Sequence, residues 1–201
     1  MSTLWIALSL LGGAVAGYFM GGLPWTQYSG DGITWLLYAM LFFVGLDLGT
    51  HGGIRKQIKA IGFDVLMLPT LVILGSLLGA WATGLALGMV GWQGAAVGAG
   101  FGWYSLSGVL LGRYDAALGA VAFLSNILRE VISLLLVPVF VRLIHPWAGI
   151  AAAGATAMDT TLPVIVKASG TNYAIQAFLS GVILSTMVPI LISILFAIAG
   201  V

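Results

Sequence analysis

Cysteine is absent from this chain of 201 residues, which excludes both a disulfide framework and a thiolate metal site. The two histidines, His51 and His145, stand far apart in the sequence and do not predict a zinc site. Charge is scarce as well, since seven Lys and Arg against six Asp and Glu leave a net charge of +1. This balance argues against a nucleic-acid partner. We therefore expect no metal, no cofactor and no nucleic acid.

The chain is rich in apolar residues. Hydrophobic residues make up 61% of it and charged residues 6%, a composition typical of polytopic membrane proteins. We expect an all-α polytopic membrane protein, 1–201, forming one transmembrane transporter domain in the lipid bilayer, with about five full transmembrane helices and two broken or re-entrant segments. The full helices are expected at about 4–22, 33–49, 62–88, 116–143 and 172–199, and the broken segments at about 94–112 and 149–168.

The helix expected over 116–143 carries Asn126, Arg129 and Glu130 near its middle. At a rise of about 1.5 Å per residue, these side chains fall near the centre of a hydrocarbon layer about 30 Å thick. A charge at that depth costs at least about 2.5 kcal/mol, so such residues face a partner or a water-filled cavity. They indicate either a transport path or a buried ion pair that only fixes helix packing.

The two broken segments hold further candidate polar groups. In the first, Gly94, Gly98 and Gly102 recur at every fourth position before Ser105 and Ser107, as a packing ridge or as a re-entrant backbone.

The second broken segment contains Asp159, Thr160, Thr161 and Pro163. Pro163 lacks the N–H that would pair with the Asp159 carbonyl, so we expect a carboxylate and a freed carbonyl at one position, as in transporter cation sites. The alternative is a plain helix kink with Asp159 at a water interface.

Basic residues predict the topology. Arg55, Lys56 and Lys59 place the loop after the second helix in the cytoplasm. If the segment at 94–112 re-enters, Arg142 and His145 also lie in the cytoplasm, which the positive-inside rule favours, although Arg113 opposes it. The two broken segments then enter from opposite faces, as in an inverted repeat.

Three stretches, 101–108, 123–130 and 154–163, resemble the LysO lysine exporter family, as does the shorter stretch 41–46. The resemblance implies export of L-lysine and close analogues from the bacterial or archaeal cytoplasm, coupled to protons. The family's intramembrane acids match Glu130 and Asp159. Members commonly carry three further N-terminal helices, so the resemblance implies either a separate small three-helix membrane subunit or a homodimer.

These observations together predict a multi-pass secondary transporter of the inner membrane, a proton-coupled lysine antiporter driven by a proton or cation gradient. Arg129 would receive the substrate carboxylate, or pair with Asp159 or with Glu130 of a neighbouring protomer. The alternative is a transporter of another small amino acid or organic ion, or a non-catalytic subunit of a membrane assembly. The candidate substrate or proton ligands are Glu130, Asp159, Arg129, Asn126, Ser105, Ser107, Thr160 and Thr161.

No enzymatic activity is expected. A serine protease would need a histidine within hydrogen-bond reach of Ser105 or Ser107, yet both histidines are expected at the cytoplasmic edge.

Overall fold

The computed structural model describes residues 12, 15–19, 35, 39 and 64–200. The chain divides into two compact units, Met1–Gly52 and Gly53–Val201, and each is described by itself. In the first unit residues 15–19 are helical. The helices expected at about 4–22 and 33–49 lie mostly outside the described residues, as does the basic loop with Arg55, Lys56 and Lys59.

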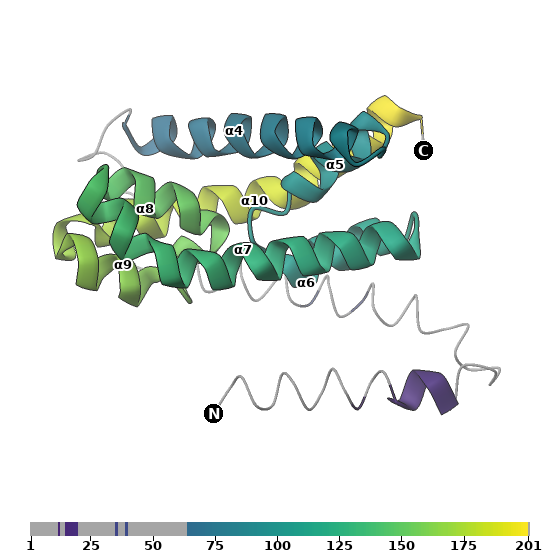
Figure 1. Ribbon diagram of the computed structural model, residues 1–201, viewed down its shortest axis with the longest axis horizontal. Coiled ribbons are helices and arrows are strands. Elements are labelled where there is room, and N and C mark those ends of the chain that lie inside the picture. The colour runs from purple at the N-terminus through teal and green to yellow at the C-terminus, as the bar shows by residue number, and fades with distance from the viewer. Residues whose placement is uncertain (1–11, 13–14, 20–34, 36–38, 40–63, 201) are drawn as a thin grey trace. The chain divides into compact units, whose positions relative to one another are not determined.

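The second unit, from residue 64 to residue 200, is helical without strands, which confirms the expected all-α class for the part of the chain that is described (Figure 1). Its elements in chain order are α4 (Asp64–Ala86), α5 (Gly91–Gly98), α6 (Tyr104–Gly112), α7 (Ala116–Leu143), α8 (Pro146–Ala153), the 3-10 helix η2 (Gly154–Met158), α9 (Leu162–Ser169), the 3-10 turn η3 (Thr171–Tyr173) and α10 (Ala174–Ala199).

Helices α4, α7 and α10 are each long and apolar enough to cross a membrane. They occupy the positions expected for helices at about 62–88, 116–143 and 172–199, and α7 has the expected bounds. Large apolar side chains such as Leu71, Leu128 and Leu135 are exposed along them, as a lipid-facing surface requires. The total of five full spans stays a prediction, because the other two fall outside the described residues.

The first broken segment is a helical hairpin. Its first arm, α5, packs along α4, and its second arm, α6, packs along α7. Trp92 at the start of α5 meets Tyr114, just after α6, with ring centroids 5.0 Å apart. Both arms therefore open at the same end of the bundle, and the chain turns back between them at residues 99–103.

The second broken segment is also a hairpin, with α8 and η2 as its first arm and α9 as its second. His145, just before α8, meets Tyr173, just after α9, at 6.2 Å between ring centroids. The indole N–H of Trp147 donates to Gln176 of α10 at 2.9 Å, which ties α8 to the same end.

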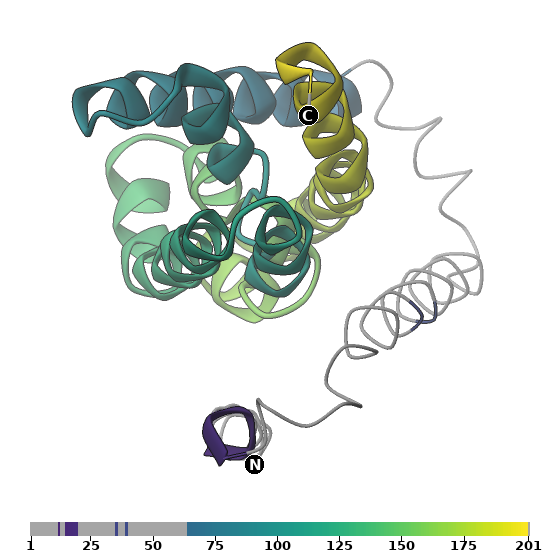
Figure 2. The same ribbon diagram turned by 90° about the vertical axis from the view of Figure 1, so that its right-hand side faces the viewer.

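The two hairpins enter the bundle from opposite ends, as Figure 1 shows. We call these the Trp92 end, where Trp92, Tyr114 and Phe196 gather, and the His145 end, where His145, Trp147 and Tyr173 gather. Helix α7 runs from the Trp92 end to the His145 end and α10 runs back, so each hairpin is followed by one long helix. Figure 2 looks along these helices and shows the two hairpins packed between α4, α7 and α10.

The sequence left open whether the glycines of the first hairpin form a packing ridge or allow a re-entrant backbone, and they do both. A Cβ on Gly94 would lie 2.5 Å from the Ala80 carbonyl oxygen, and one on Gly98 would lie 2.6 Å from the Ser76 carbonyl oxygen. These two glycines let α5 approach α4 closely. Gly102 has a φ of +97° and lies in the turn itself, where a glycine adopts a backbone that other residues rarely do.

Gly94→Ala should lower the stability of the purified protein by about 1–3 kcal/mol, because the new methyl group overpacks the α4–α5 contact. Gly75→Ala is the matched control, since a Cβ on this α4 glycine meets nothing within 4 Å. Thermal unfolding in detergent measures both. Equal melting temperatures for the two variants would contradict the close packing of α5 on α4.

Candidate substrate site

The tips of the two hairpins touch each other midway along the bundle. The backbone N–H of Ala155 in η2 donates a 2.8 Å hydrogen bond to the carbonyl of Phe101 in the first turn. Gly154 has a φ of +66°, and a Cβ there would clash with the same carbonyl oxygen. Phe101 also has a positive φ of 48° and is fully buried. Two chain breaks that are more than fifty residues apart in sequence thus share one location.

Asn126 of α7 holds the first break in place. It is 3% exposed, and its side-chain oxygen accepts a 2.7 Å hydrogen bond from the Gly102 N–H. Its amide nitrogen lies 3.1 Å from the Val97 carbonyl and 3.3 Å from the Ser107 hydroxyl. A Cβ on Gly100 would clash with this amide group, so glycine at this position leaves room for Asn126. Asn126 therefore satisfies backbone groups that the break leaves free.

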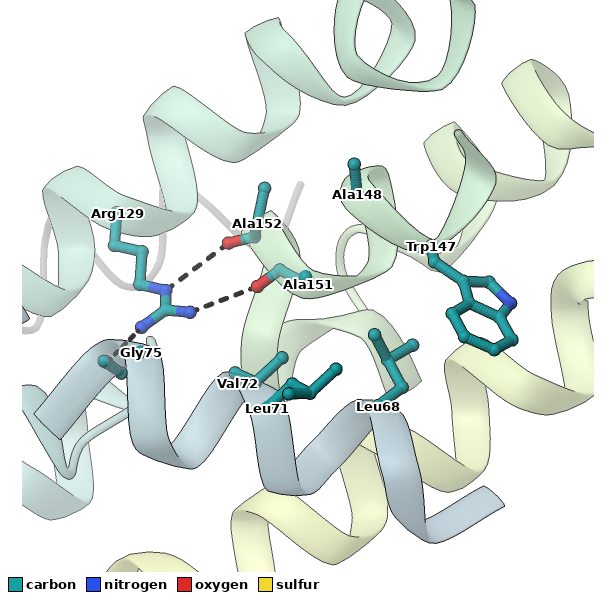
Figure 3. A pocket seen from close by; sticks show the side chains of 10 residues that line it. Leu68, Leu71, Val72, Gly75, Arg129, Trp147, Ala148, Ala151 and Ala152 are labelled. Atoms are coloured by element: carbon teal, nitrogen blue, oxygen red, sulfur yellow. Dashed lines mark hydrogen bonds between the residues drawn. The ribbon is translucent and has the colours of Figure 1, made fainter. Parts of the chain in front are cut away.

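Arg129, one helical turn further along α7, holds the second hairpin. Its guanidinium donates to the Ala152 carbonyl at 3.4 Å and to the Ala151 carbonyl at 3.2 Å, both at the C-terminal end of α8 (Figure 3). It also donates to the Ser76 hydroxyl of α4 at 2.8 Å. A cation at the C-terminal end of a helix is stabilised by the helix dipole. Among the described residues its partners are backbone carbonyls and a hydroxyl, not a carboxylate.

Arg129 also lines a cavity of about 540 Å³ between α4, α7 and α8. Figure 3 shows that the labelled α4 side chains facing it are apolar, with Trp147 at the far end. The polar side chains of the lining are those of Arg129 and Ser76, which bind each other. This cavity therefore offers no carboxylate to an ammonium substrate.

The two predicted acids lie on another side of the meeting point. Glu130 is half-buried on α7 and Asp159 is exposed between η2 and α9. Both carboxyl groups lie within electrostatic range of the hydroxyl of Tyr104, the first residue of α6. Consecutive helical residues point about 100° apart, which explains how Glu130 is separated from the face that Arg129 uses. Tyr104 is therefore a neighbour of both acids, one on α7 and one beside α9.

The sequence predicted that Asp159 offers both its carboxylate and a backbone carbonyl freed by Pro163, but the structure shows that this carbonyl is not free. The Asp159 carbonyl accepts a 3.3 Å hydrogen bond from the Leu162 N–H. Pro163 lies in the first turn of α9, where its missing N–H has no intrahelical partner to lose, so the proline releases no carbonyl. The expectation of a freed Asp159 carbonyl is wrong; its side chain accepts from the Thr160 N–H and hydroxyl.

The hydroxyl candidates divide into two kinds. Ser107 and Thr161 are fully buried: Ser107 donates to the Trp103 carbonyl at 2.9 Å, and Thr161 lies 3.3 Å from the Thr156 hydroxyl. Ser105 and Thr160 are exposed beside the meeting point. Of the predicted residues, Asn126, Arg129, Ser107 and Thr161 are thus held by the protein interior. Glu130 is half-buried, and Asp159, Ser105 and Thr160 are exposed to a ligand, although Thr160 also donates to Asp159.

Sequence reasoning missed two residues that belong here. Ser76 donates to the Gly98 carbonyl at 2.9 Å while accepting from Arg129, so it joins α4 to the first hairpin directly and to the second hairpin through Arg129. It looked like an ordinary helix-packing serine. Tyr104 lies within the stretch 101–108, and its position directly after the glycine-rich break is the signal that could have identified it.

The sequence of this chain matches a known protein family over nearly its whole length. The sequence profile described as lysine exporter LysO matches residues 7–196. The chain belongs to the LysO lysine exporter family. It is 35% identical over 190 residues to the lysine exporter LysO of Escherichia coli strain K12, and this alignment covers 93% of the chain and 63% of that relative. No solved structure matches.

A second relative is aligned over nearly the same length of this chain. The chain is 33% identical over 186 residues to a putative lysine exporter of Haemophilus influenzae, with 91% of the chain and 94% of that relative covered. The chain thus spans less than two thirds of the E. coli protein and nearly all of the H. influenzae one. Lysine exporters are transporters, which agrees with the expectation that the chain is not an enzyme.

Asn126→Ala should destabilise the protein by about 2–4 kcal/mol, because it leaves the buried Gly102 N–H without a partner and leaves the Val97 carbonyl with the Gly100 N–H alone. Ser125→Ala, one residue earlier on an exposed face of α7, is the matched control and should change stability by less than about 0.5 kcal/mol. Thermal unfolding in detergent reports the difference. A tolerated Asn126→Ala would contradict the role of this amide in holding the break.

Proposed function

We propose that this chain is a secondary transporter that exports L-lysine from the bacterial cytoplasm in exchange for protons. The observation that carries the proposal is the meeting of two opposed hairpins beside Glu130 and Asp159, an arrangement typical of transporter sites at the membrane midplane. The names of its E. coli and H. influenzae relatives support lysine as the substrate.

The substrate would use groups that the protein leaves open. Lysine has two ammonium groups and one carboxylate, so Glu130 and Asp159 suit the ammonium groups by charge. Arg129 already binds Ala151, Ala152 and Ser76. We therefore assign the substrate carboxylate to the N-terminal ends of α6 and α9, which begin at the two breaks and carry the positive ends of their dipoles.

Exchange with protons follows from the same two acids. A carboxylate that binds an ammonium group in one state binds a proton in the next, so lysine and protons occupy the site alternately. After lysine leaves on the outer side, Glu130 and Asp159 take up protons, and these protons leave toward the cytoplasm before lysine binds again. A proton gradient directed inward thereby drives lysine outward.

Charge at the two ends of the bundle supports one orientation. Arg142 and Lys167 lie in the last turns of α7 and α9, at the His145 end, whereas Arg113 lies at the Trp92 end beside Asp115. The excess of basic residues at the His145 end favours placing it in the cytoplasm. The first hairpin then enters from outside and the second from inside, within a multi-pass protein of the inner membrane.

Assembly belongs to the proposal as well. We expect the transport-competent unit to contain either a small membrane subunit of three helices or a second copy of this chain. Reconstituting the chain alone and with co-purifying membrane protein distinguishes these cases, because only a homodimer transports without addition.

An intramembrane protease is the enzymatic rival, and the geometry opposes it. Ser107 binds Asn126 and two backbone carbonyls, and Ser105 lies near the middle of the bundle. His145 lies at the end of the bundle, where it packs against Trp147 and Tyr173. Among the described residues no histidine reaches either serine.

Glu130→Gln and Asp159→Asn should each reduce proton-driven lysine export at least about tenfold, since each removes a charge from the shared substrate and proton site. Transport into and out of proteoliposomes under an imposed pH gradient measures this. Asp115→Asn is the control: Asp115 caps α7 through the Leu118 N–H at 2.7 Å, and asparagine caps equally well. Normal export by both site variants would refute the assignment of the acids.

Tyr104→Phe removes a hydroxyl within electrostatic range of both acids, while the ring still packs edge-on against Phe123 at 5.4 Å. We expect a rise in the lysine concentration needed for half-maximal export of about fivefold to tenfold, with little change in stability. Tyr114→Phe, at the Trp92 end, is the matched control. If both variants export lysine as the unmodified protein does, Tyr104 takes no part in the site.

A further inference from the structure

A second cavity lies at the His145 end, away from the acids. It has a volume of about 470 Å³ and is lined by two cationic side chains, Arg142 and Lys167, with four apolar residues: Pro138, Pro163, Val164 and Ala168. The cations come from different helices, α7 and α9, and both are exposed. Among the described residues neither has a hydrogen bond or an ion pair. The lining contains no acidic side chain.

The depth of Arg142, which lines this cavity, matches the phosphate layer of a membrane. Arg129 lies at the midpoint of α7. Arg142 comes thirteen residues later, which is about 20 Å along a helix. Half of a hydrocarbon core is about 15 Å, so Arg142 lies just beyond it, among the lipid headgroups. Trp147 and Tyr173 gather at the same end, as the aromatic belt of a membrane interface does.

The composition of the cavity fits one kind of ligand. Two cations attract a phosphate group, and the apolar walls next to them suit the first carbons of acyl chains. Helix α7 continues from the cavity toward the bilayer centre with exposed Leu135 and Leu128, a surface along which such chains can lie. A soluble anion would use the cations but not these walls.

We propose that the pocket formed by Arg142 and Lys167 binds the phosphate of an anionic phospholipid. Basic pockets between membrane helices on the cytoplasmic side recognise lipid headgroups in this way. Its two cations lie in the last turns of α7 and α9, twelve residues after Glu130 and eight after Asp159, and the site requires only that the protein lies in a bilayer. The inference therefore does not depend on which substrate is carried.

The test is native mass spectrometry of the full chain in detergent, with phosphatidylglycerol and phosphatidylcholine of identical acyl chains. Wild type should bind phosphatidylglycerol more tightly than phosphatidylcholine. Arg142→Gln and Lys167→Gln should each weaken phosphatidylglycerol binding about fivefold, and the double variant about 25-fold. Arg113→Gln, which removes one charge at the opposite end, should leave it unchanged, and Lys167→Arg should retain it.

Three outcomes would overturn the proposal: equal binding of the two lipids by wild type, an undiminished preference in the double variant, or equal weakening by Arg113→Gln. Inorganic phosphate is added in a parallel series to separate the two sources of a phosphate group. If phosphate alone abolishes the wild-type phosphatidylglycerol complex, the occupant is a soluble anion and the lipid assignment fails. Melting temperatures of all variants show that each is folded.

Discussion

The backbone groups exposed where α5 and α8 end are the constraint on which the rest of this membrane unit depends. A broken helix leaves carbonyl and N–H groups without partners, and the bilayer interior supplies no water to satisfy them. Helix α7 supplies them instead from one face. Asn126 binds the Val97 carbonyl and the Gly102 N–H of the first hairpin, and Arg129 binds the last carbonyls of α8. The polar face of α7 is thus needed to satisfy the backbone groups that the two breaks expose.

Satisfying the α8 carbonyls with an arginine has a consequence for the acids. A guanidinium carries several donors in a planar fork, so it reaches two carbonyls and the Ser76 hydroxyl at once, which a lysine ammonium on its flexible stem does poorly. Ser133 adds a 2.7 Å hydrogen bond to the Ala152 carbonyl. Because the guanidinium of Arg129 binds the carbonyls of α8, it does not form an ion pair with Glu130 or Asp159 among the described residues. This is the arrangement that the proposed cationic substrate needs.

The sequence predicted much of this architecture, for reasons that differ by element. The long helices were readable because uninterrupted apolar runs have one stable form in a bilayer, and α7 has the bounds that its apolar run predicted, Ala116–Leu143. The breaks were readable from glycine spacing and from Pro163. The partner of Arg129 was not, because a backbone carbonyl leaves no mark in the sequence. The same holds for Ser76, which touches Arg129 across fifty-three positions of chain. Pro163 misled because a proline has the same sequence signature inside a helix and in its first turn.

The way α7 divides its side chains also limits how the unit can move. Asn126 binds only the first hairpin, whereas the contacts of Arg129 with α8 belong to the second, and Ser76 of α4 joins Arg129 to the Gly98 carbonyl. A movement of the second hairpin against α7 must therefore break the Arg129 contacts and the Ala155–Phe101 hydrogen bond together, while the Asn126 contacts persist. The first hairpin and α7 behave as one body in such a movement. The acids fall on both sides of this division, since Glu130 lies on α7 and Asp159 beside α9. Opening the contact between hairpins would separate the two carboxylates, so a ligand that binds both is held only while the hairpins meet.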